Sequence, residues 1–286
     1  METSMTLQKQ TSTLQRKKRG RYRIKQVDKT SRMILGILVV FAFVFLYFIT
    51  VMCEYRWDQV RIDFILEILP KFVDFSQLSS SFWQSIGYSL INTVLLSVVT
   101  TLLGAMIGLF LGLGAARNLS HPFISNVIRA FAGFIRAVPT IIWAILFVSG
   151  FGLSATTAIV GMSFHSIAYF IKSYSEAFEE VEEGTLEAMR ATGANWWQIV
   201  TSAILPSSFT KMISWVAMRS EMNFAAAVII GPAVGVPGTI GSILNQCSRA
   251  GDYGGLGLCV LTIFLTALVF EVMITRYKQK TIVNAS

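Results

Sequence analysis

Hydrophobic residues in this chain gather in long runs that shorter polar stretches separate. Six runs are long enough for a helix that crosses a lipid bilayer, because about 20 apolar residues at 1.5 Å per residue span its hydrocarbon core. They lie at about 33–53, 86–116, 126–151, 155–171, 207–230 and 256–275. The pattern therefore predicts an all-α membrane protein with about six transmembrane helices.

The polar stretches predict how the chain is organised. An arm at 1–32 precedes the first transmembrane helix, 33–53, and a loop at 54–85 follows it. The other helices form a core at 86–280, whose longest polar connection is 172–206. That connection is the largest surface that the core offers to a partner in water.

Three glycines in the second run repeat at intervals of four. Gly104, Gly108 and Gly112 form a tandem G-x-x-x-G pattern. Small residues at this spacing let two membrane helices approach closely. We predict that they mark a helix-packing face.

Composition agrees with a membrane protein. Only 14% of the residues are charged and the mean hydropathy is +0.60, whereas a soluble domain has about 25% charged residues. The three cysteines, Cys53, Cys247 and Cys259, have no C-x-x-C spacing. We therefore expect no metal or redox site.

Positive charge is concentrated before the first helix. Residues 1–32 hold ten Lys and Arg against Glu2 and Asp28. Such a segment suggests nucleic-acid binding, but its position favours a role in fixing membrane orientation, so no nucleic-acid partner is expected. Six helices place both termini on one side, and the basic arm predicts that this side is cytoplasmic.

Turn signals divide the connection at 172–206. Gly184 is placed to end a helix that leaves the membrane, and Thr185 to cap the next one. Gly193 can end that second helix in a left-handed conformation. Asn195, with Gln198 three residues later, then predicts a new helix start of the capping-box type.

The predicted helix before Gly193 is only about two turns long and presents Leu186, Met189 and Arg190. A helix this short is unstable alone, so it rests either on the lipid surface or in a groove of a partner. Pro206 is expected to break or kink the chain where it re-enters the membrane.

The same segment resembles the signature loop of ABC-importer permeases, E-A-A-x3-G-x9-I-x-L-P. The residues in register are Glu187, Ala188, Gly193, Leu205 and Pro206, whereas Met189 and Ala203 replace the usual Ala and Ile. The resemblance implies a type I permease fold whose short cytoplasmic helix couples to an ATPase. The implied coupling residues are Leu186, Glu187, Ala188, Met189, Arg190, Gly193 and Pro206.

Four further stretches resemble the phosphonate-type permeases in particular. They are FIRAVPTIIWAILFV (134–148), FHSIAYFIKSYSEAFEEVEEGTLEAMRATGA (164–194), RSEMNFAAAVIIG (219–231) and VGVPGTIG (234–241). Together the similarity covers about 80–280. It implies a multi-pass subunit of the bacterial inner membrane that carries phosphonate or a related small phosphorus oxyanion.

The resemblance also implies partners. These are an extracytoplasmic solute-binding protein, a second permease copy or paralogue, and cytoplasmic ABC ATPase subunits. The sequence contains no G-x-x-x-x-G-K-[ST] phosphate loop, so ATP and Mg are expected on the ATPase chain. This chain is expected to hold no cofactor and to be a transport subunit rather than an enzyme.

Charged residues inside the predicted helices are costly and usually functional. Arg136 precedes Pro139 in the third run, and Arg219 and Glu221 lie in the fifth. Residues two apart on a helix do not face each other, so Glu221 is expected to pair with Arg136 rather than Arg219. All four residues either hold helices together or line a translocation path. His165 is expected to form an interhelical hydrogen bond, with a place on the path as the alternative.

Other functions remain open at this stage. The same architecture serves ABC permeases for amino acids, metals or other oxyanions. An ion-coupled secondary transporter would need internal repeats and ion ligands at the membrane midplane, and none are evident. A membrane enzyme would need a catalytic cluster, which the sequence also lacks.

Overall fold

The computed structural model describes residues 29–52 and 61–283 of the chain. The chain divides into two units, 1–62 and 63–286. All but the last four residues of the predicted arm, 1–32, lie outside the described ranges, as does Cys53. Every regular element in the described ranges is helical, which confirms the predicted all-α class.

The first unit contains one long helix, α2 (Lys29–Tyr47), which continues as a π-helical turn (Phe48–Met52). It starts four residues before the predicted Met33. Its apolar side chains are exposed along the whole length. A helix that is apolar from Met33 onward is suited to a lipid environment.

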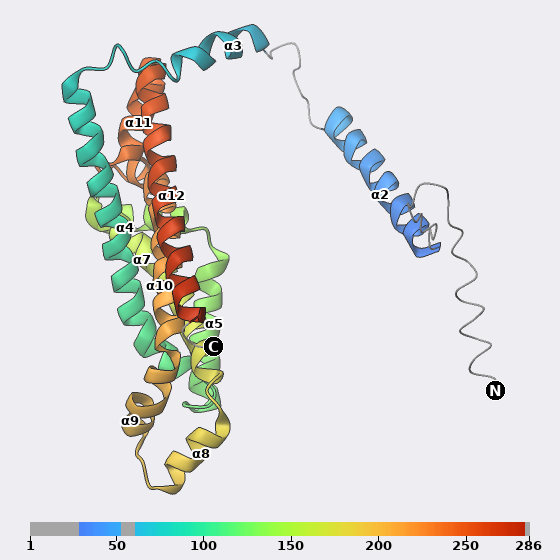
Figure 1. The fold of residues 1–286 in the computed structure, drawn as a ribbon, viewed down its shortest axis with the longest axis vertical. Helices are drawn as coiled ribbons and strands as arrows, with labels where there is room; N and C mark the ends of the chain where they lie inside the picture. The colour runs from blue at the N-terminus through green and yellow to red at the C-terminus, as the bar shows by residue number, and fades with distance from the viewer. Residues whose placement is uncertain (1–28, 53–60, 284–286) are drawn as a thin grey trace, which may run out of the picture. The chain divides into compact units, whose positions relative to one another are not determined.

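The second unit is a helical bundle (Figure 1). Its elements are α3 (Ile62–Lys71), α4 (Ser80–Ala115), α5 (Pro122–Ala137), α6 (Thr140–Phe151), α7 (Ala155–Glu179), α8 (Glu183–Ala191), α9 (Trp196–Ile199), the π-helix η3 (Val200–Ile204), α10 (Leu205–Ala233), α11 (Ile240–Ala250) and α12 (Tyr253–Val283). Helix α7 packs against α4, α5, α6 and α10. Helices α8 and α9 lie at one end of the bundle and α11 at the other.

The glycine repeat of α4 packs directly against α7. A Cβ atom on Gly104 would lie 2.6 Å from the Cβ of Ser166, and one on Gly112 would lie 3.1 Å from the Cβ of Tyr174. A Cβ atom on Gly108 would lie closer still to the Cβ of Phe170. The contact positions advance by four on both helices, so the predicted helix-packing face is confirmed.

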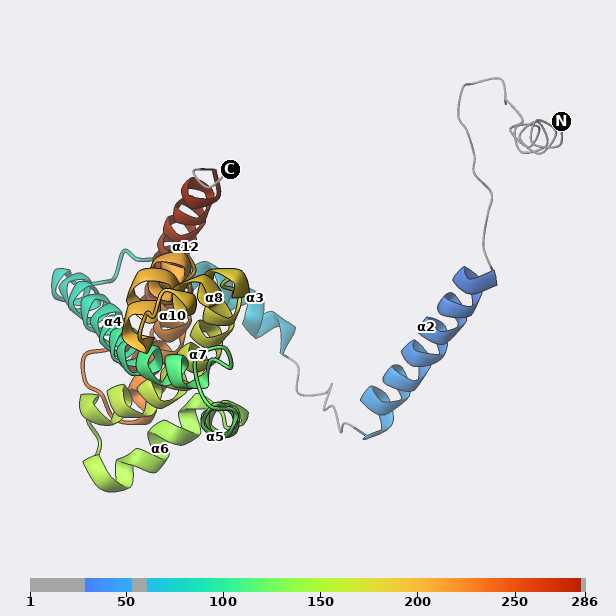
Figure 2. The same ribbon diagram turned by 90° about the horizontal axis from the view of Figure 1, so that it is seen from below.

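The helix predicted at 126–151 is two helices. Helices α5 and α6 meet at an angle of 93°, and Figure 2 shows α6 turning away from α5. Pro139 disfavours helical backbone at the preceding residue, and Val138 is accordingly extended, with φ −94° and ψ 128°. The run predicted at 126–151 is therefore helical on both sides of Pro139 and sharply bent at that proline.

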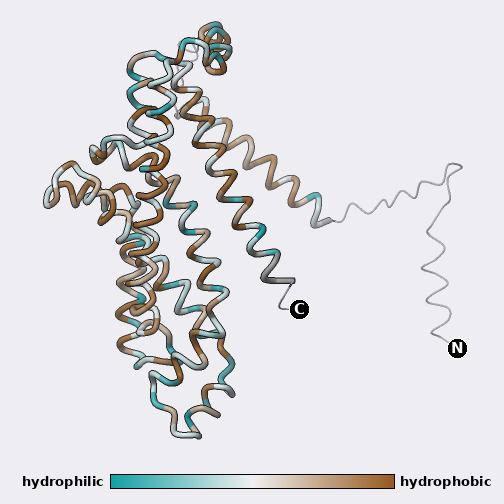
Figure 3. Tube along the Cα trace, turned by 60° about the vertical axis from the view of Figure 1, so that its left-hand side comes forward, coloured by the Kyte–Doolittle hydropathy of each residue, from teal (hydrophilic) through white to brown (hydrophobic). Residues whose placement is uncertain are grey.

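Four helices among the described residues are long and apolar enough to cross a membrane, or five if the bent α5–α6 pair counts as one span. The four are Thr30–Val51, Ser80–Ala115, Trp196–Ala233 and Tyr253–Tyr277. Figure 3 shows the hydrophobic colour along α12, which gives way to hydrophilic residues near its C-terminal end.

Helix α7, predicted as the span 155–171, forms but falls outside this set. Its neighbours cover it, so it buries polar side chains such as Thr157, Ser166 and Ser175. A helix enclosed by protein has no need of the apolar surface that lipid demands.

Candidate functional site

The short helix α8 begins after Glu182, whose backbone is extended. Gly184 and Thr185 lie inside its first turn, so the prediction that they separate two helices is wrong. Helix α7 already ends at Glu179. An acidic residue in the first turn, here Glu183, favours a start at this point because it complements the helix dipole.

The end of α8 follows the sequence prediction. Gly193 has φ +82°, the left-handed conformation that glycine adopts without steric cost. The backbone N–H of Ala194 donates to the Met189 carbonyl at 3.1 Å, and that of Gly193 donates to the Arg190 carbonyl at 3.0 Å. This pair of bonds is a Schellman motif, which fixes where α8 stops.

The predicted capping box is also present. Gln198 N–H donates to Asn195 Oδ1 at 2.9 Å, and Asn195 N–H donates to Gln198 Oε1 at 2.7 Å. The helix that starts here continues to Ala233, so of the predicted break or kink at Pro206 the break does not occur. A π-helical turn, in which Leu205 N–H bonds to the Val200 carbonyl, precedes the proline and adapts the backbone to it.

The two faces of α8 differ. Leu186 is 1% exposed and packs among Phe178, Ile199 and Ile204, with Met189 partly buried beside it. The expectation that Leu186 and Met189 are presented outward is therefore wrong. Glu187, Ala188 and Ala191 occupy the exposed face. The apolar face of α8 rests on its own bundle, which stabilises a helix too short to stand alone.

Two side chains tie this segment to the connection between α4 and α5. Arg190 Nη2 donates to the Asn118 carbonyl at 3.0 Å, and Trp196 Nε1 donates to the Leu119 carbonyl at 3.0 Å. Asn118 Nδ2 in turn donates to the Phe178 carbonyl at 2.9 Å. Sequence reasoning missed these contacts because the partners are far apart along the chain and follow no spacing rule.

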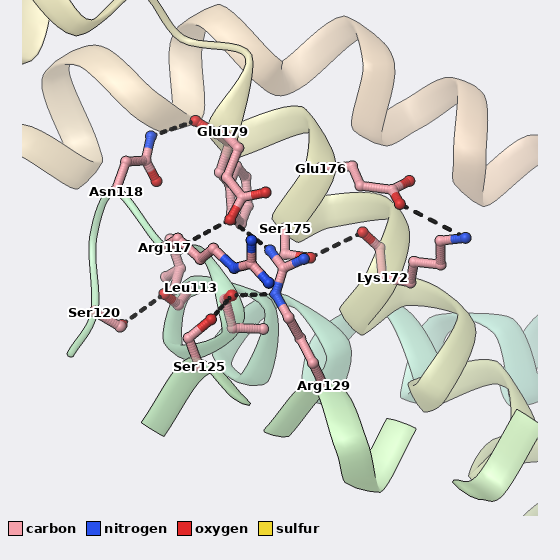
Figure 4. A network of polar contacts seen from close by, with 12 residues as sticks. Leu113, Arg117, Asn118, Ser120, Ser125, Arg129, Lys172, Ser175, Glu176 and Glu179 are labelled. Carbon is pink, nitrogen blue, oxygen red and sulfur yellow. Dashed lines mark hydrogen bonds and ion pairs between the residues drawn. The ribbon is translucent and has the colours of Figure 1, made fainter. Parts of the chain in front are cut away.

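A second network joins the ends of α5 and α7 (Figure 4). Arg129 forms an ion pair with Glu179 and donates through Nε to the Ala115 carbonyl at 2.8 Å. Glu179 also accepts the Arg117 backbone N–H at 2.7 Å, and Ser125 Oγ donates to the Ala115 carbonyl. We call Arg129, Glu179 and the backbone groups they bind the α5–α7 clamp.

The expected ion pair between Arg136 and Glu221 does not form. Arg136 is exposed in the last turn of α5, next to the bend at Pro139, and Glu221 is half-buried on α10. Within the described residues neither has an ion-pair partner, although Lys172 and Arg129 do. Arg136 lines a cavity of about 200 Å³ with Arg129, Lys172 and Glu176.

Arg219 is 4% exposed and is held by neutral groups. Its Nε donates to Ser166 Oγ at 3.2 Å, and its guanidinium carbon lies 5.1 Å from the centre of the Tyr169 ring. Asn223 Nδ2 bonds both Ser166 Oγ, at 3.0 Å, and Thr101 Oγ1, at 2.9 Å. As predicted, Arg219 does not pair with Glu221. This polar cluster joins α4, α7 and α10, and sequence reasoning found only its arginine.

His165 lies on α7 one turn from Tyr169. Its Nδ1 is buried and makes no hydrogen bond in the described part of the chain, so the predicted interhelical bond is wrong. Arg219 contacts Ser166 and Tyr169, which flank His165 on α7. Arg136 lines a cavity with Lys172, one turn farther along the same helix.

The chain matches known proteins over most of its length. The sequence model of the family described as "Binding-protein-dependent transport system inner membrane component" matches residues 104–283. The phosphate-import permease protein PhnE of Mycolicibacterium smegmatis is 29% identical over 209 residues, 71% of this chain and 39% of that protein. The phosphite transport system permease protein PtxC of Stutzerimonas stutzeri is 33% identical over 175 residues, 61% and 63% respectively.

Other relatives carry different names. The probable D-methionine transport system permease protein MetI of Pasteurella multocida is 29% identical over 192 residues, 63% of this chain and 79% of that protein. A chain from an inward-facing structure of the MetNI methionine ABC transporter superposes with a TM-score of 0.61 at 20% identity, covering 70% of this chain and 97% of that one. This likeness shows a shared fold.

The chain spans less than two thirds of the length of PhnE and of PtxC. The family match, by contrast, covers more than half of this chain and includes α8, the clamp and all of the Arg219 cluster except Thr101. The chain belongs to the family of binding-protein-dependent transport system inner membrane components.

Proposed function

We propose that this chain is the membrane-spanning permease subunit of an ATP-driven importer for phosphonate or a related small phosphorus oxyanion. Family membership supports the transport role, and the phosphate and phosphite permeases among its relatives support the solute class. The partners are an extracytoplasmic solute-binding protein, a second permease copy or paralogue, and two cytoplasmic ATPase subunits. ATP and Mg bind to the ATPase chains.

The observation that carries this proposal is the two-sided structure of α8. Leu186 and Met189 anchor the helix in the bundle. Glu187 and Ala188 remain exposed on the opposite face of the helix. The coupling residues that the resemblance implies thus divide between an internal anchor and an external surface. A cytoplasmic ATPase meets the external surface, and any force on it passes to the bundle through the anchor.

Two routes lead from α8 into the membrane helices. One runs through α9 and η3 into α10, the helix that carries Arg219 and Glu221. The other runs through Arg190 and the connection between α4 and α5. Closure of the ATPase pair on ATP would move both α8 helices together, and α10 and α5 would follow. The path opens outward in this state, and ATP hydrolysis resets it.

This mechanism sets the orientation of the chain. Helices α8 and α9 face the cytoplasm, and α11 lies toward the outer side. The C-terminal end of α12 points toward the end of the bundle that carries α8 (Figure 1). We propose that both termini are cytoplasmic in the bacterial inner membrane.

Assembly with the ATPase tests the mechanism. Ala188→Arg places a bulky charge on the exposed face of α8, and Ala250→Arg makes the same change at an exposed alanine of α11. We expect Ala188→Arg to abolish co-purification with the ATPase subunit and Ala250→Arg to preserve it. Retained assembly of the Ala188→Arg protein would overturn the proposed role of α8.

One observation supports a different solute: MetI of Pasteurella multocida is 29% identical to this chain over 192 residues, the same identity as PhnE shows over 209. Uptake by vesicles that contain the assembled importer and its binding protein separates the two. Import of methylphosphonate or phosphite supports the proposed solute class. Import of methionine alone would replace that class and leave the importer assignment intact.

A further inference from the structure

Arg219 is a buried cation without an acidic partner. It is 4% exposed on α10, and no carboxylate forms an ion pair with it among the described residues. Glu221, two residues away, points elsewhere because positions two apart leave a helix in different directions. A buried charge costs several kcal/mol unless an opposite charge compensates it.

The contacts of Arg219 leave part of its guanidinium available. Nε is held by Ser166 Oγ, which Asn223 supports, and the plane lies near the Tyr169 ring. No hydrogen bond from its two terminal nitrogens occurs within the described chain. A guanidinium fixed through Nε presents its other donors as a fork that matches an oxyanion.

The neighbouring groups are donors or cations as well. Arg136 has no ion pair among the described residues and lines a cavity with Lys172, which lies one turn from Tyr169 on α7. His165 Nδ1 is buried and has no hydrogen bond among the described residues, and the Tyr169 hydroxyl lies near Ser173. Buried polar groups nearly always have partners, so the His165 imidazole is placed to bond a ligand.

We propose that Arg219, Arg136, His165 and Tyr169 form a binding site for a small oxyanion inside the bundle, between α5, α7 and α10. This inference rests on the proposed function for the identity of the anion. Arg219 and Arg136 supply the charge, and the imidazole and phenol donate hydrogen bonds. The mechanism moves α10 and α5, which carry Arg219 and Arg136, so the strength of the site changes with the state of the importer.

A route out of this site is visible on α7. His165, Tyr169 and Lys172 follow one another at helical spacing along one face. Arg136 and Lys172 both line the cavity of about 200 Å³. Lys172 forms a 3.6 Å ion pair with Glu176 at the half-exposed rim. An anion that leaves Arg219 therefore meets Arg136 next and then Lys172. Because Glu176 partly neutralises Lys172, the attraction for the anion decreases along this order and favours its release toward α8.

The test measures anion binding to the purified full chain in phospholipid-free detergent micelles by calorimetry. The probes are methylphosphonate, sulfate and methionine. Arg136→Gln removes an exposed charge and leaves the packing intact. Arg219→Lys keeps the buried charge but lacks the two terminal nitrogens of the guanidinium. Arg249→Gln is the matched control on α11, where the arginine bonds Asn245. Thermal melting without ligand verifies that each variant is folded.

We expect wild-type protein and Arg249→Gln to bind methylphosphonate and not methionine. Loss of one charge-assisted contact should weaken binding about tenfold or more in Arg136→Gln and in Arg219→Lys. Unchanged affinity in both variants, or no oxyanion binding by the wild-type chain, would overturn the site.

A lipid phosphate shares this chemistry, so the measurement is repeated in phosphatidylcholine nanodiscs with and without phosphatidylglycerol. Methylphosphonate binding that persists with phosphatidylglycerol supports a solute site, and its displacement assigns the side chains to a lipid headgroup and overturns it. Transport separates the two proposals: an Arg136→Gln importer that moves phosphonate at the wild-type rate refutes the site alone. An importer that binds oxyanions here but moves another solute refutes the proposed solute alone.

Discussion

Arg129 on α5 and Glu179 in the last turn of α7 form an ion pair with a nitrogen–oxygen distance of 2.5 Å, and each side chain is about a quarter exposed. The same carboxylate accepts the backbone N–H of Arg117, and the same guanidinium donates to the Ala115 carbonyl. The pair therefore fastens the end of α4, the start of α5 and the end of α7 next to α8.

We expect Arg129→Gln and Glu179→Gln each to lower the free energy of unfolding by about 1–3 kcal/mol, because each leaves a half-buried charge or carbonyl without its partner. The double variant should lose less than the sum of the two. Lys172→Gln is the control, since its exposed i,i+4 pair with Glu176 is worth about 0.5 kcal/mol or less. Strictly additive losses in detergent unfolding would show that the clamp is no coupled unit.

The α4–α7 interface predicts a graded response to added methyl groups. Gly104→Ala brings a Cβ against Ser166, so we expect a loss of about 1–3 kcal/mol from overpacking. Gly112→Ala is less crowded and should cost less. Gly87→Ala lies on the same helix with nothing within 4 Å and should not destabilise it. Thermal melting of the three variants gives the order, and equal melting temperatures would contradict the close approach.

Two glycines near α8 should respond with opposite sign. Gly193→Ala forces a side chain into a left-handed conformation and should destabilise the segment by about 1 kcal/mol. Gly184→Ala occupies a helical position in open space, and alanine there should stabilise α8 by about 0.5–1 kcal/mol. Amide hydrogen exchange across 183–195 reads both effects. Protection that falls in both variants would mean that Gly184 ends a helix.

The inward position of Leu186 predicts a stability defect that needs no partner. Leu186→Ala should cost about 2–5 kcal/mol through the cavity it leaves, measured on the purified chain without ATPase. Ala188→Ser, on the exposed face, should melt like the wild type. If Leu186→Ala instead melts normally and fails only to bind the ATPase, the side chain faces the partner.

Glu221 has no ion-pair partner among the described residues, so we predict that Glu221→Gln preserves membrane abundance and lowers uptake. Abundance is measured by quantitative immunoblot and uptake with the assembled importer. A proportional fall of both would indicate that Glu221 supports the fold rather than the path.

Features that depend on neighbours in sequence were predictable. The left-handed turn at Gly193, the capping box of Asn195 and Gln198 and the glycine face of α4 all follow from rules that act within one or two helical turns. Local rules failed where two signals competed. Gly184 resembled a helix end, but Glu183 and the docking of Leu186 favour a helix that includes it.

Contacts between residues that are far apart in the sequence could not be predicted from sequence patterns. The expected pairing of Arg136 with Glu221 rested on charge alone, whereas Arg136 lines a cavity with Lys172 of α7 and Glu221 is half-buried on α10. The same holds for Arg129 and Glu179, which are 50 residues apart. Neither residue belongs to a motif, and only the packing of α5 on α7 brings them together.

By itself, the sequence determined that the chain is helical, that it belongs in a membrane and that a short capped helix follows the fourth apolar run, because hydrophobic length and capping act locally. The tertiary structure alone decided which face of that helix is buried, where α5 turns into α6 and which groups surround Arg219. These features depend on how helices from distant parts of the chain pack together. Packing energy depends on the fit between two whole helix surfaces, which the spacing of residues along a single helix does not specify.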